Sequence, residues 1–262
     1  MKTIVITGST RGIGYGLADA LLRLGCSVAI SGRTQQKVDA AVATLSAGHG
    51  SEQLMGLACD VTKFEQVRAL WDAAKTRFGK VDIWINNAGV NPGRLPFWQL
   101  SSDHIQAGVA TNLIGAMNCA VVAISGMLEQ GSGAVYNMEG LGSNGRRIKG
   151  LTLYGTTKYG LAYLTDALAD ETRGTPVIVG AIKPGMVVTE LLTKPFEGKP
   201  AEWERAKKVF NILAERVETV TPWIADKVLA NTKTGIRIQW LTPSRLGFCV
   251  LRALFSKRDL FR

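Results

Sequence analysis

Short runs of apolar, β-branched residues alternate along the chain with longer segments in which apolar residues recur every three to four positions. The apolar runs lie at 3–7, 27–31, 81–86, 133–138 and 176–182, with a weaker run at 53–58 and a last candidate at 236–241. Helical periodicity falls at 12–24, 35–46, 63–77, 103–129 and 155–172. Strands that alternate with helices require crossover connections. The pattern therefore predicts an α/β fold with a doubly wound parallel sheet of about seven strands, covered by helices on both faces.

No repeat, low-complexity tract or linker divides the 262 residues, so we expect a single domain over 1–262. Residues 186–225 break the alternation and are rich in Lys, Glu, Pro and Trp. An insertion after a late strand of an open α/β sheet is placed to cover the ligand crevice at the carboxyl ends of the strands. We therefore predict a helical substrate lid at 186–225. A C-terminal extension, the hydrophobic and basic tail at 243–262, follows it.

Composition and charge exclude several classes of protein. Four scattered cysteines without a Cys-x-x-Cys pair, together with only His49 and His104, argue against a zinc site or a disulfide scaffold, and we expect no metal. The net charge of +10 favours an anionic partner. Because no recognition motif accompanies that charge, we expect no nucleic acid. No apolar run reaches the roughly 18 residues that span a bilayer and no signal peptide is visible, so we expect a cytoplasmic protein.

A glycine-rich segment, Thr7-Gly-Ser-Thr-Arg-Gly-Ile-Gly14, stands between the first predicted strand and the first predicted helix. Glycine lets the backbone turn sharply and approach a pyrophosphate, and a helix N-terminus offers free N–H groups to the anion. In this context the segment predicts dinucleotide binding in a Rossmann-type fold. The second strand ends at Arg33 without the acidic residue that binds a ribose 2′-hydroxyl. Arg33 and Arg11 therefore favour NADPH/NADP, which carries a 2′-phosphate.

These features, with Asp60-Val61, Asn86-Asn-Ala-Gly89, Asn112, Tyr154-x-x-x-Lys158 and Lys183-Pro-Gly-Met-Val-Val-Thr189 in order, resemble the short-chain dehydrogenase/reductase family over nearly the whole chain. The resemblance implies a set of cofactor-binding residues. These are Gly8, Ser9, Thr10, Arg11, Gly12, Ile13, Gly14, Arg33, Thr34, Asp60, Val61, Asn87, Ala88, Gly89, Tyr154, Lys158, Pro184, Gly185, Val187 and Thr189.

A narrower likeness is to the chlorophyll b reductase subgroup. It is carried by 82–91, 111–115, 137–140 and 184–192, and by Leu241-Thr-Pro-Ser-Arg245 before the tail. The resemblance implies NADPH-dependent reduction of the C7 formyl group of chlorophyll b, or chlorophyllide b, to a hydroxymethyl group, as in chlorophyll degradation. It also implies that an acidic residue and a glycine, here Glu139 and Gly140, replace the serine that the wider family carries.

Tyr154 and Lys158 are four residues apart at the start of a predicted helix and share one face of it. A free tyrosine, with a pKa near 10, is a weak acid–base partner at neutral pH, and a nearby ammonium is expected to lower that pKa. These residues predict a carbonyl reductase in which Tyr154 donates the proton. By resemblance, Lys158 also binds the nicotinamide ribose and Asn112 helps to hold a water that relays protons.

Gly140 stands where a second oxyanion donor is expected, and losing one such donor typically costs about a hundredfold to a thousandfold in rate. Ser143, Asn144 or a backbone N–H near Gly140 are candidate replacements, and for Ser143 a plain turn residue is an equal alternative. An aldehyde, more reactive than a ketone, needs less help. Glu139, Gly140 and Met186 are candidate substrate-binding residues. For Glu139 the stronger expectation is a solvated loop carboxylate.

The partners expected are a hydrophobic, pigment-like small molecule and a second copy of the chain, in a homodimer or homotetramer. The tail mixes large apolar residues with five basic ones, so peripheral membrane contact through 243–262 is one possibility. Packing on the lid or in a dimer is the other. The aromatic residues Trp98, Phe196, Trp203 and Trp223 are candidates to wall a large apolar pocket, or equally to be core residues.

Two alternatives to the chlorophyll b activity stay open. The same chemistry could act on another bulky hydrophobic aldehyde or ketone, such as a 3-oxoacyl, steroid or quinone-like compound, because substrate identity lies in the lid. A non-catalytic NADP-binding sensor is the other. Gly140 is its only support, whereas Asn112, Tyr154 and Lys158 oppose it.

Overall fold

A seven-stranded, wholly parallel sheet forms the centre of the protein. The computed structural model describes residues 1–255 and 258–261. The strands follow the order β3-β2-β1-β4-β5-β6-β9, as expected for a doubly wound sheet. Their bounds are β1 Thr3–Ile6, β2 Ser27–Gly32, β3 Leu54–Ala58, β4 Ile83–Asn86, β5 Gly133–Met138, β6 Val177–Lys183 and β9 Arg237–Gln239. The predicted fold class and strand number are confirmed.

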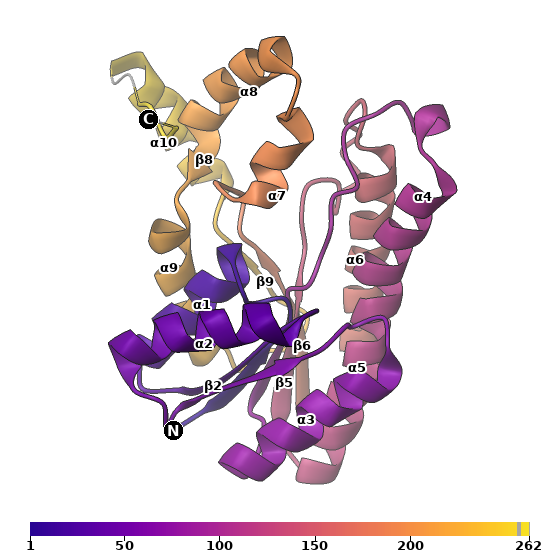
Figure 1. Ribbon diagram of the computed structural model, residues 1–262, viewed down its shortest axis with the longest axis vertical. Coiled ribbons are helices and arrows are strands. Elements are labelled where there is room, and N and C mark those ends of the chain that lie inside the picture. Colours follow the sequence, from indigo (N-terminus) through magenta and orange to yellow (C-terminus); the bar gives the residue numbers. More distant parts are fainter. Residues whose placement is uncertain (256–257, 262) are drawn as a thin grey trace.

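Helices cover both faces of the sheet (Figure 1). One face packs against α1 (Gly12–Arg23), α2 (Gln35–His49) and α9 (Val217–Ala230), and the other against α3 (Phe64–Phe78), α5 (Gly115–Gln130) and α6 (Thr152–Glu171). The central strands β1 and β4 are buried on both faces because helices lie on each side. Both cores are aliphatic, and Trp71 and Trp84 lie together in the second, with ring centroids 6.1 Å apart.

The segment predicted as one helix at 103–129 is helical throughout, but its hydrogen-bond pattern changes in the middle. The segment comprises α4 (Ser102–Val109), the π-helical turn η2 (Ala110–Ile114) and α5. π-Turns are rare and occur frequently at functional sites, and this one contains Asn112. By length and composition, 102–130 is long and apolar enough to cross a membrane, which the sequence did not suggest. In the fold it packs against α3, β4 and β5, as a core helix does.

A small unit follows β6 at the carboxyl end of the sheet. It contains β7 (Met186–Val187), α7 (Glu190–Thr193), η3 (Lys194–Phe196), α8 (Pro200–Leu213) and β8 (Ala214–Glu215), with β7 and β8 paired. Its core is aromatic and includes Phe196 and Phe210. We call this unit, residues 186–215, the lid, and its role in covering a substrate stays a prediction. From Val217 onward the chain forms α9, which packs against α1 in the main domain.

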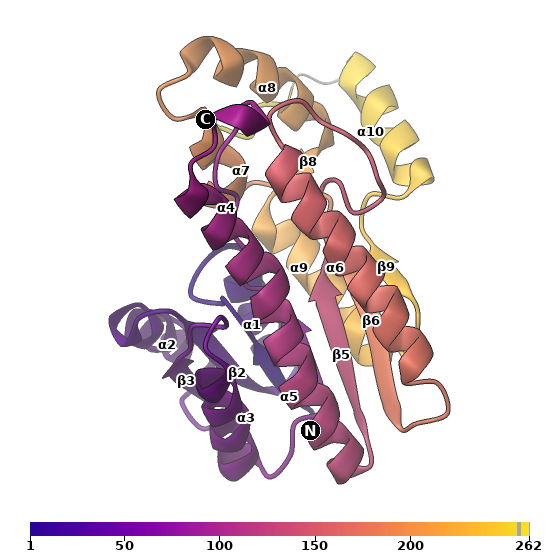
Figure 2. The same ribbon diagram turned by 90° about the vertical axis from the view of Figure 1, so that its right-hand side faces the viewer.

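The tail folds back onto this unit. Helix α10 (Pro243–Phe255) packs against α8, and both lie at the same end of the molecule (Figures 1 and 2). The Arg258 guanidinium donates to the carboxylate of Glu215 at 2.9 and 2.5 Å, and Phe261 lies 4.8 Å from Trp203 between ring centroids. The expected packing of the tail on the lid is therefore confirmed.

The three basic residues of the tail that the structure describes contact other parts of the protein. Arg252 and Arg258 bind Glu215, and Arg245 stacks over Trp240 at 3.7 Å. Lys257 and Arg262 lie outside the described residues. The outer face of α10 is instead apolar. Its exposed large apolar residues, among those described, are Leu246, Phe248, Val250, Leu251 and Phe255.

The four aromatic residues proposed for one pocket do not come together. Trp203 and Phe196 pack in the lid core, with centroids 5.8 Å apart. Trp223 packs edge-on against Trp240 beneath Arg245. Trp98, on the turn η1 (Phe97–Gln99), is 84% exposed. Of the two alternatives open for these residues, Phe196 and Trp203 follow the second, as core residues of the lid.

Candidate active site

The glycine loop after β1 is held against the segment after β4. The Thr7 hydroxyl oxygen accepts hydrogen bonds from the backbone N–H groups of Asn87 and Ala88, each at 3.1 Å. The Asn87 side-chain amide donates to the carbonyls of Thr7 and Gly8 at 2.9 and 2.8 Å. A β-carbon at Gly8 would lie 2.8 Å from the Ala88 α-carbon, so only glycine fits. Thr7 was not among the predicted site residues. Its position directly before the first glycine was the available signal.

The loop ends at a helix N-terminus that suits an anion. Gly12, with φ +60°, begins α1; no side chain caps the helix and no acidic residue lies in its first turn. A β-carbon at Gly14 would lie 2.5 Å from the side-chain nitrogen of Asn87. Free N–H groups at a positive helix end, with backbone approach left open by glycine, fit a pyrophosphate. The residues around this loop therefore match the predicted dinucleotide.

The predicted cofactor residues lie around the carboxyl ends of the central strands. Arg33 is exposed directly after β2, and Thr34 precedes α2. Ser9 is buried and binds the Ile6 carbonyl at 2.6 Å, so its hydroxyl supports the loop. A β-carbon at Gly12 would touch Thr189 at 3.4 Å, which brings the segment after β6 to the glycine loop. The remaining predicted residues lie in three places. They are Thr10 and Ile13 at the glycine loop and the start of α1, Asp60 and Val61 after β3, and Pro184, Gly185 and Val187 after β6.

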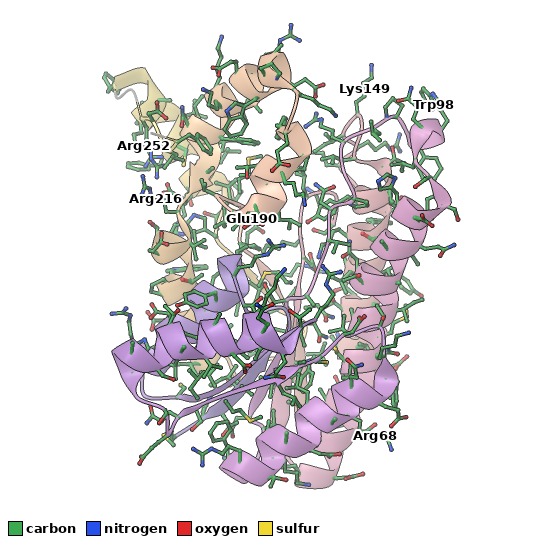
Figure 3. All side chains as sticks on the ribbon, viewed as in Figure 1. Arg68, Trp98, Lys149, Glu190, Arg216 and Arg252 are labelled. Atoms are coloured by element: carbon green, nitrogen blue, oxygen red, sulfur yellow. The ribbon has the colours of Figure 1, made fainter. Side chains whose placement is uncertain are left out.

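Arg11 is already engaged with the lid. Its guanidinium forms an ion pair with the carboxylate of Glu190, the first residue of α7, and both side chains are about two-thirds exposed. Glu190 is labelled in Figure 3, at the base of the lid. Sequence reasoning missed Glu190, because nothing in its spacing from Arg11 predicts this contact. The cation expected to bind a 2′-phosphate thus has a carboxylate partner in this structure.

Tyr154 and Lys158 lie in the first two turns of α6, as predicted. The Lys158 ammonium is buried and donates to the Met138 carbonyl at 2.8 Å, at the end of β5. It lies 5.8 Å from the centroid of the Tyr154 ring. Asn112 and Lys158 both approach Gly89, where a β-carbon would lie 3.4 Å from the Asn112 side-chain oxygen and 3.7 Å from the ammonium. Asn112 and Lys158 therefore meet at one point after β4.

The acid–base properties differ from the sequence-based expectation. Burial raises the pKa of Tyr154 to about 12, so the expected lowering by Lys158 is not seen. Burial lowers the pKa of Lys158 to about 8, and the negative charge of Glu139 partly opposes that shift. At neutral pH the phenol is thus protonated and the amine is mostly an ammonium. This state suits donation of a proton to a carbonyl oxygen.

Gly140 lies directly against the hydroxyl of Tyr154. A β-carbon at position 140 would lie 2.6 Å from the phenolic oxygen and 3.5 Å from the Lys158 side chain. Real β-carbons essentially never come so close to another heavy atom. The position is therefore occupied by the tyrosine hydroxyl itself, and a serine here would compete with it for space.

Glu139 is not the solvated carboxylate that was expected. It is 1% exposed, and its oxygens lie 3.0 Å from the Lys183 ammonium and 3.2 Å from the Arg237 guanidinium. Arg237 also binds Asp166 through two bonds of 2.7 Å. Because the carboxylate is enclosed by these cations, the structure gives it no contact surface for a substrate. The sequence did not indicate this network, because its members are separated by up to 98 residues.

Asn112 holds the segment after β4 against α6. Its side-chain oxygen accepts from the Val90 N–H at 2.8 Å, and its amide donates to the Val90 carbonyl at 2.9 Å and to Thr157 at 3.0 Å. The side chain is therefore fully used for positioning. The predicted water relay stays a prediction.

The remaining candidates lie near the tyrosine and in the lid. Ser143 is buried, and its N–H donates to the Gly140 carbonyl at 3.1 Å, so it belongs to the same turn. Asn144 is exposed and its side-chain oxygen accepts from the Arg146 N–H at 3.2 Å. Met186 packs against the aromatic core of the lid. The structure keeps Ser143 as a donor candidate and places Met186 at the base of the lid.

Sequence comparison agrees with this geometry. A family model described as short chain dehydrogenase matches residues 2–200. The chain belongs to the short-chain dehydrogenase/reductase family. It is 35% identical to "Probable chlorophyll(ide) b reductase NYC1, chloroplastic" of Arabidopsis thaliana, over 99% of this chain and 54% of that protein. It is 36% identical to "Chlorophyll(ide) b reductase NOL, chloroplastic" of Oryza sativa subsp. japonica, over 97% of this chain and 73% of that protein.

The relatives differ from this chain in length, and solved structures share its fold. The chain spans about half the length of the NYC1 proteins of Arabidopsis and rice. Levodione reductase shares the fold, with a TM-score of 0.80 and 24% identity over 91% of this chain and 96% of that one. Family membership and fold make this short-chain dehydrogenase/reductase an NAD(P)-dependent oxidoreductase that acts on CH–OH or C=O groups.

Proposed function

We propose that this short-chain dehydrogenase/reductase uses NADPH to reduce a bulky hydrophobic aldehyde, the C7 formyl group of chlorophyll b or chlorophyllide b, to a hydroxymethyl group. The choice of substrate is supported by the 35–37% identity to proteins named as chlorophyll(ide) b reductases, over 88–99% of this chain. Protonated Tyr154 beside Lys158 supports the direction of reduction, because a phenol with a raised pKa gives up its proton only to a strong acceptor.

The residues of the chain would divide the reaction as follows. When bound, the dihydronicotinamide supplies the hydride that is added to the carbonyl carbon. The Tyr154 hydroxyl donates its proton to the carbonyl oxygen, which becomes the alcohol. The Lys158 ammonium stabilises the phenolate that remains, and Asn112 holds the segment 88–90 in place around both groups. One aldehyde, one NADPH and one proton thus give one primary alcohol and one NADP⁺.

Arg11 and Arg33 support a preference for the phosphorylated cofactor. Both lie at the carboxyl ends of β1 and β2, where the adenine ribose binds in this fold, and neither segment supplies an acidic residue of its own. Titration of intrinsic fluorescence with NADPH and with NADH tests this proposal. Tighter binding of NADPH is expected, and replacing Arg33 with Asp should reverse the order. A wild-type preference for NADH would contradict the proposal.

The substrate is tested by product analysis. Chlorophyllide b, a long-chain aldehyde, a steroid ketone and a 3-oxoacyl ester are each supplied with NADPH. The proposal expects the hydroxymethyl pigment as the fastest-formed product. Faster reduction of the steroid would favour the alternative in which the substrate is another bulky hydrophobic ketone. One relative supports that alternative: the 3alpha-hydroxysteroid dehydrogenase of Mediterraneibacter gnavus is 30% identical over 73% of this chain. NADPH binding without turnover of any carbonyl would favour the sensor.

We also propose self-association through α5 and α6. These helices, with the last residue of η2, carry a set of exposed, large apolar side chains, which are Ile114, Met117, Val121, Leu128, Tyr159 and Tyr163. Covering such a face is a common reason for pairing. Light scattering of the wild type and of Met117→Glu/Tyr163→Glu tests the proposal, with a dimer or tetramer expected to become a monomer. A monomeric wild type would contradict it.

A further inference from the structure

The loops after β4 and β5 carry an exposed surface that the proposed reaction does not use. Phe97 and Trp98 on η1 are 47% and 84% exposed. Arg146, Arg147 and Lys149, in the loop that leads to α6, are all exposed. Among the described residues, no carboxylate forms an ion pair with any of these three cations. Contiguous exposed apolar surface of this kind often marks a site that a partner protein or a membrane covers.

The two loops form one surface. The Leu95 N–H donates to the Gly150 carbonyl at 3.2 Å, and a β-carbon at Gly150 would lie 2.9 Å from the Arg94 side chain. Figure 3 shows Trp98 and Lys149 close together at one end of the molecule. Segments 91–100 and 140–151 contain four basic residues and no acidic residue. Glu139, which directly precedes the second segment, is buried and does not reach this surface.

We propose that this aromatic and basic surface, formed by Phe97, Trp98, Arg146, Arg147 and Lys149, docks the protein on an anionic lipid bilayer. Tryptophan is favoured at the boundary between lipid headgroups and acyl chains, and exposed lysine and arginine side chains bind anionic headgroups. Leu141, at the start of the basic loop, is a further exposed apolar side chain. The combination of rings that enter the interface and unpaired cations beside them is what a lipid surface requires.

Helix α10 favours a bilayer over a nucleic acid. Single-stranded nucleic acids also bind to cations with neighbouring aromatic rings. The outer face of α10, however, exposes Phe248, Leu251 and Phe255, and α10 lies at the same end of the molecule as Trp98 (Figures 1 and 3). A nucleic acid in water would not bury the apolar face of α10, whereas a bilayer can bury both this face and the aromatic rings of η1. This docking goes beyond the proposed reductase function and does not depend on it.

Sedimentation with lipid vesicles tests the proposal without any measurement of turnover. The full chain is mixed with vesicles of phosphatidylcholine alone, or of phosphatidylcholine with phosphatidylglycerol. Binding is expected only with the anionic lipid and should weaken as salt is raised. Each cation near an anionic surface contributes about fivefold to binding, so Arg146→Gln/Arg147→Gln/Lys149→Gln should bind roughly a hundredfold more weakly. Trp98→Ala should reduce binding by about tenfold.

A charge-matched variant provides the control. Lys63→Gln/Arg68→Gln/Lys75→Gln removes the same net charge from exposed positions on or just before α3, and Arg68 lies at the opposite end of the molecule from Trp98 (Figure 3). It should bind as the wild type does. Circular dichroism and NADPH binding must be unchanged in both triple variants, because all six residues are exposed.

Several results would overturn the proposal. Equal losses in the two triple variants would show that net charge alone drives binding. Loss of binding in Phe248→Ser/Leu251→Ser/Phe255→Ser, with full binding in the loop variants, would assign docking to α10 instead. Wild-type binding to single-stranded RNA but not to vesicles, abolished by the loop substitutions, would identify a nucleic-acid surface. Absence of wild-type binding to anionic vesicles would also reject the proposal.

Discussion

The hydroxyl of Tyr154 lies in the space that a side chain at position 140 would fill. A β-carbon at Gly140 would approach the phenolic oxygen to 2.6 Å. The absence of a side chain at position 140 therefore leaves room for the tyrosine hydroxyl. A glycine in place of the usual serine is thus compatible with a working site. Restoring a serine is expected to damage this enzyme.

The first prediction is that Gly140→Ser and Gly140→Ala both lower kcat/KM with an aldehyde by roughly tenfold to a hundredfold, because small displacements of a catalytic group have effects of that size. Gly155→Ala is the matched control. It adds the same methyl group next to Tyr154, at a position where nothing lies within 4 Å, and should leave turnover unchanged. A serine variant faster than the wild type would show that the wild-type site lacks an oxyanion donor that a serine at position 140 can supply.

The second prediction concerns pH. The ammonium of Lys158 is present below its pKa of about 8 and is lost above it. Reduction should therefore fall as pH rises through about 8, while Tyr154, with a pKa of about 12, remains protonated. Glu139→Gln removes the negative charge that raises the Lys158 pKa, so the alkaline limb of kcat/KM should move to lower pH.

Asp166→Asn is the control for that measurement. It breaks the exposed half of the same ion-pair network, at Arg237, but the Asp166 charge does not act on Lys158. Its alkaline limb should coincide with that of the wild type. Coincident limbs for Glu139→Gln and the wild type would show that Glu139 only holds Lys183 and Arg237 in place.

The third prediction is that Glu190→Gln tightens NADPH binding by about twofold to fivefold and leaves NADH binding unchanged. The Glu190 carboxylate pairs with Arg11 and competes with the cofactor phosphate, and an exposed ion pair is worth only that much. Fluorescence titration measures both constants. Glu202→Gln, an exposed lid residue on α8, serves as control. Equal tightening for NADH would mean that Arg11 does not contact the 2′-phosphate.

The fourth prediction concerns the ion pairs between Glu215 in the lid and the arginines of the tail. Glu215 accepts from Arg252 and Arg258 and is largely buried, so Glu215→Gln should destabilise the fold by about 1–3 kcal/mol. The arginines lower the pKa of Glu215 against the effect of burial. Its contribution is thus present above the unfolded pKa near 4.3 and is lost as pH falls further.

Thermal unfolding at neutral pH and at acid pH measures this contribution. The difference between the wild type and Glu215→Gln should shrink at acid pH. Glu218→Gln, an exposed neighbour in the first turn of α9, should match the wild type throughout. A difference that stays constant with pH would contradict the role of the carboxylate charge.

Local patterns predicted the fold and the order of the site residues well, because apolar periodicity and glycine spacing directly reflect sheet and loop geometry. The predicted strand at 133–138 matches β5, and the helix carrying Tyr154 and Lys158 starts three residues earlier than predicted. Contacts between distant segments could not be predicted. The burial of Glu139 depends on Lys183 and Arg237, and the grouping of Trp98 with Arg146 depends on how two loops pair.

The pKa of Tyr154 was predicted in the wrong direction for a physical reason. The sequence shows that an ammonium is close, but burial disfavours the charged forms of both residues and dominates here. Only the three-dimensional surroundings determine which effect is larger. The helix α9, which begins within the predicted lid segment 186–225, packs against α1, and that contact between distant segments could not be predicted either.

Single-turnover reduction of chlorophyllide b by NADPH, compared between the wild type and Tyr154→Phe, tests the account most directly. The phenylalanine variant keeps the ring and loses only the hydroxyl group that would donate the proton to the carbonyl oxygen. We predict formation of the hydroxymethyl pigment by the wild type. In the variant we predict a rate lower by about a hundredfold or more, with NADPH binding retained. Equal rates in the two proteins, or no pigment reduction by the wild type, would contradict it.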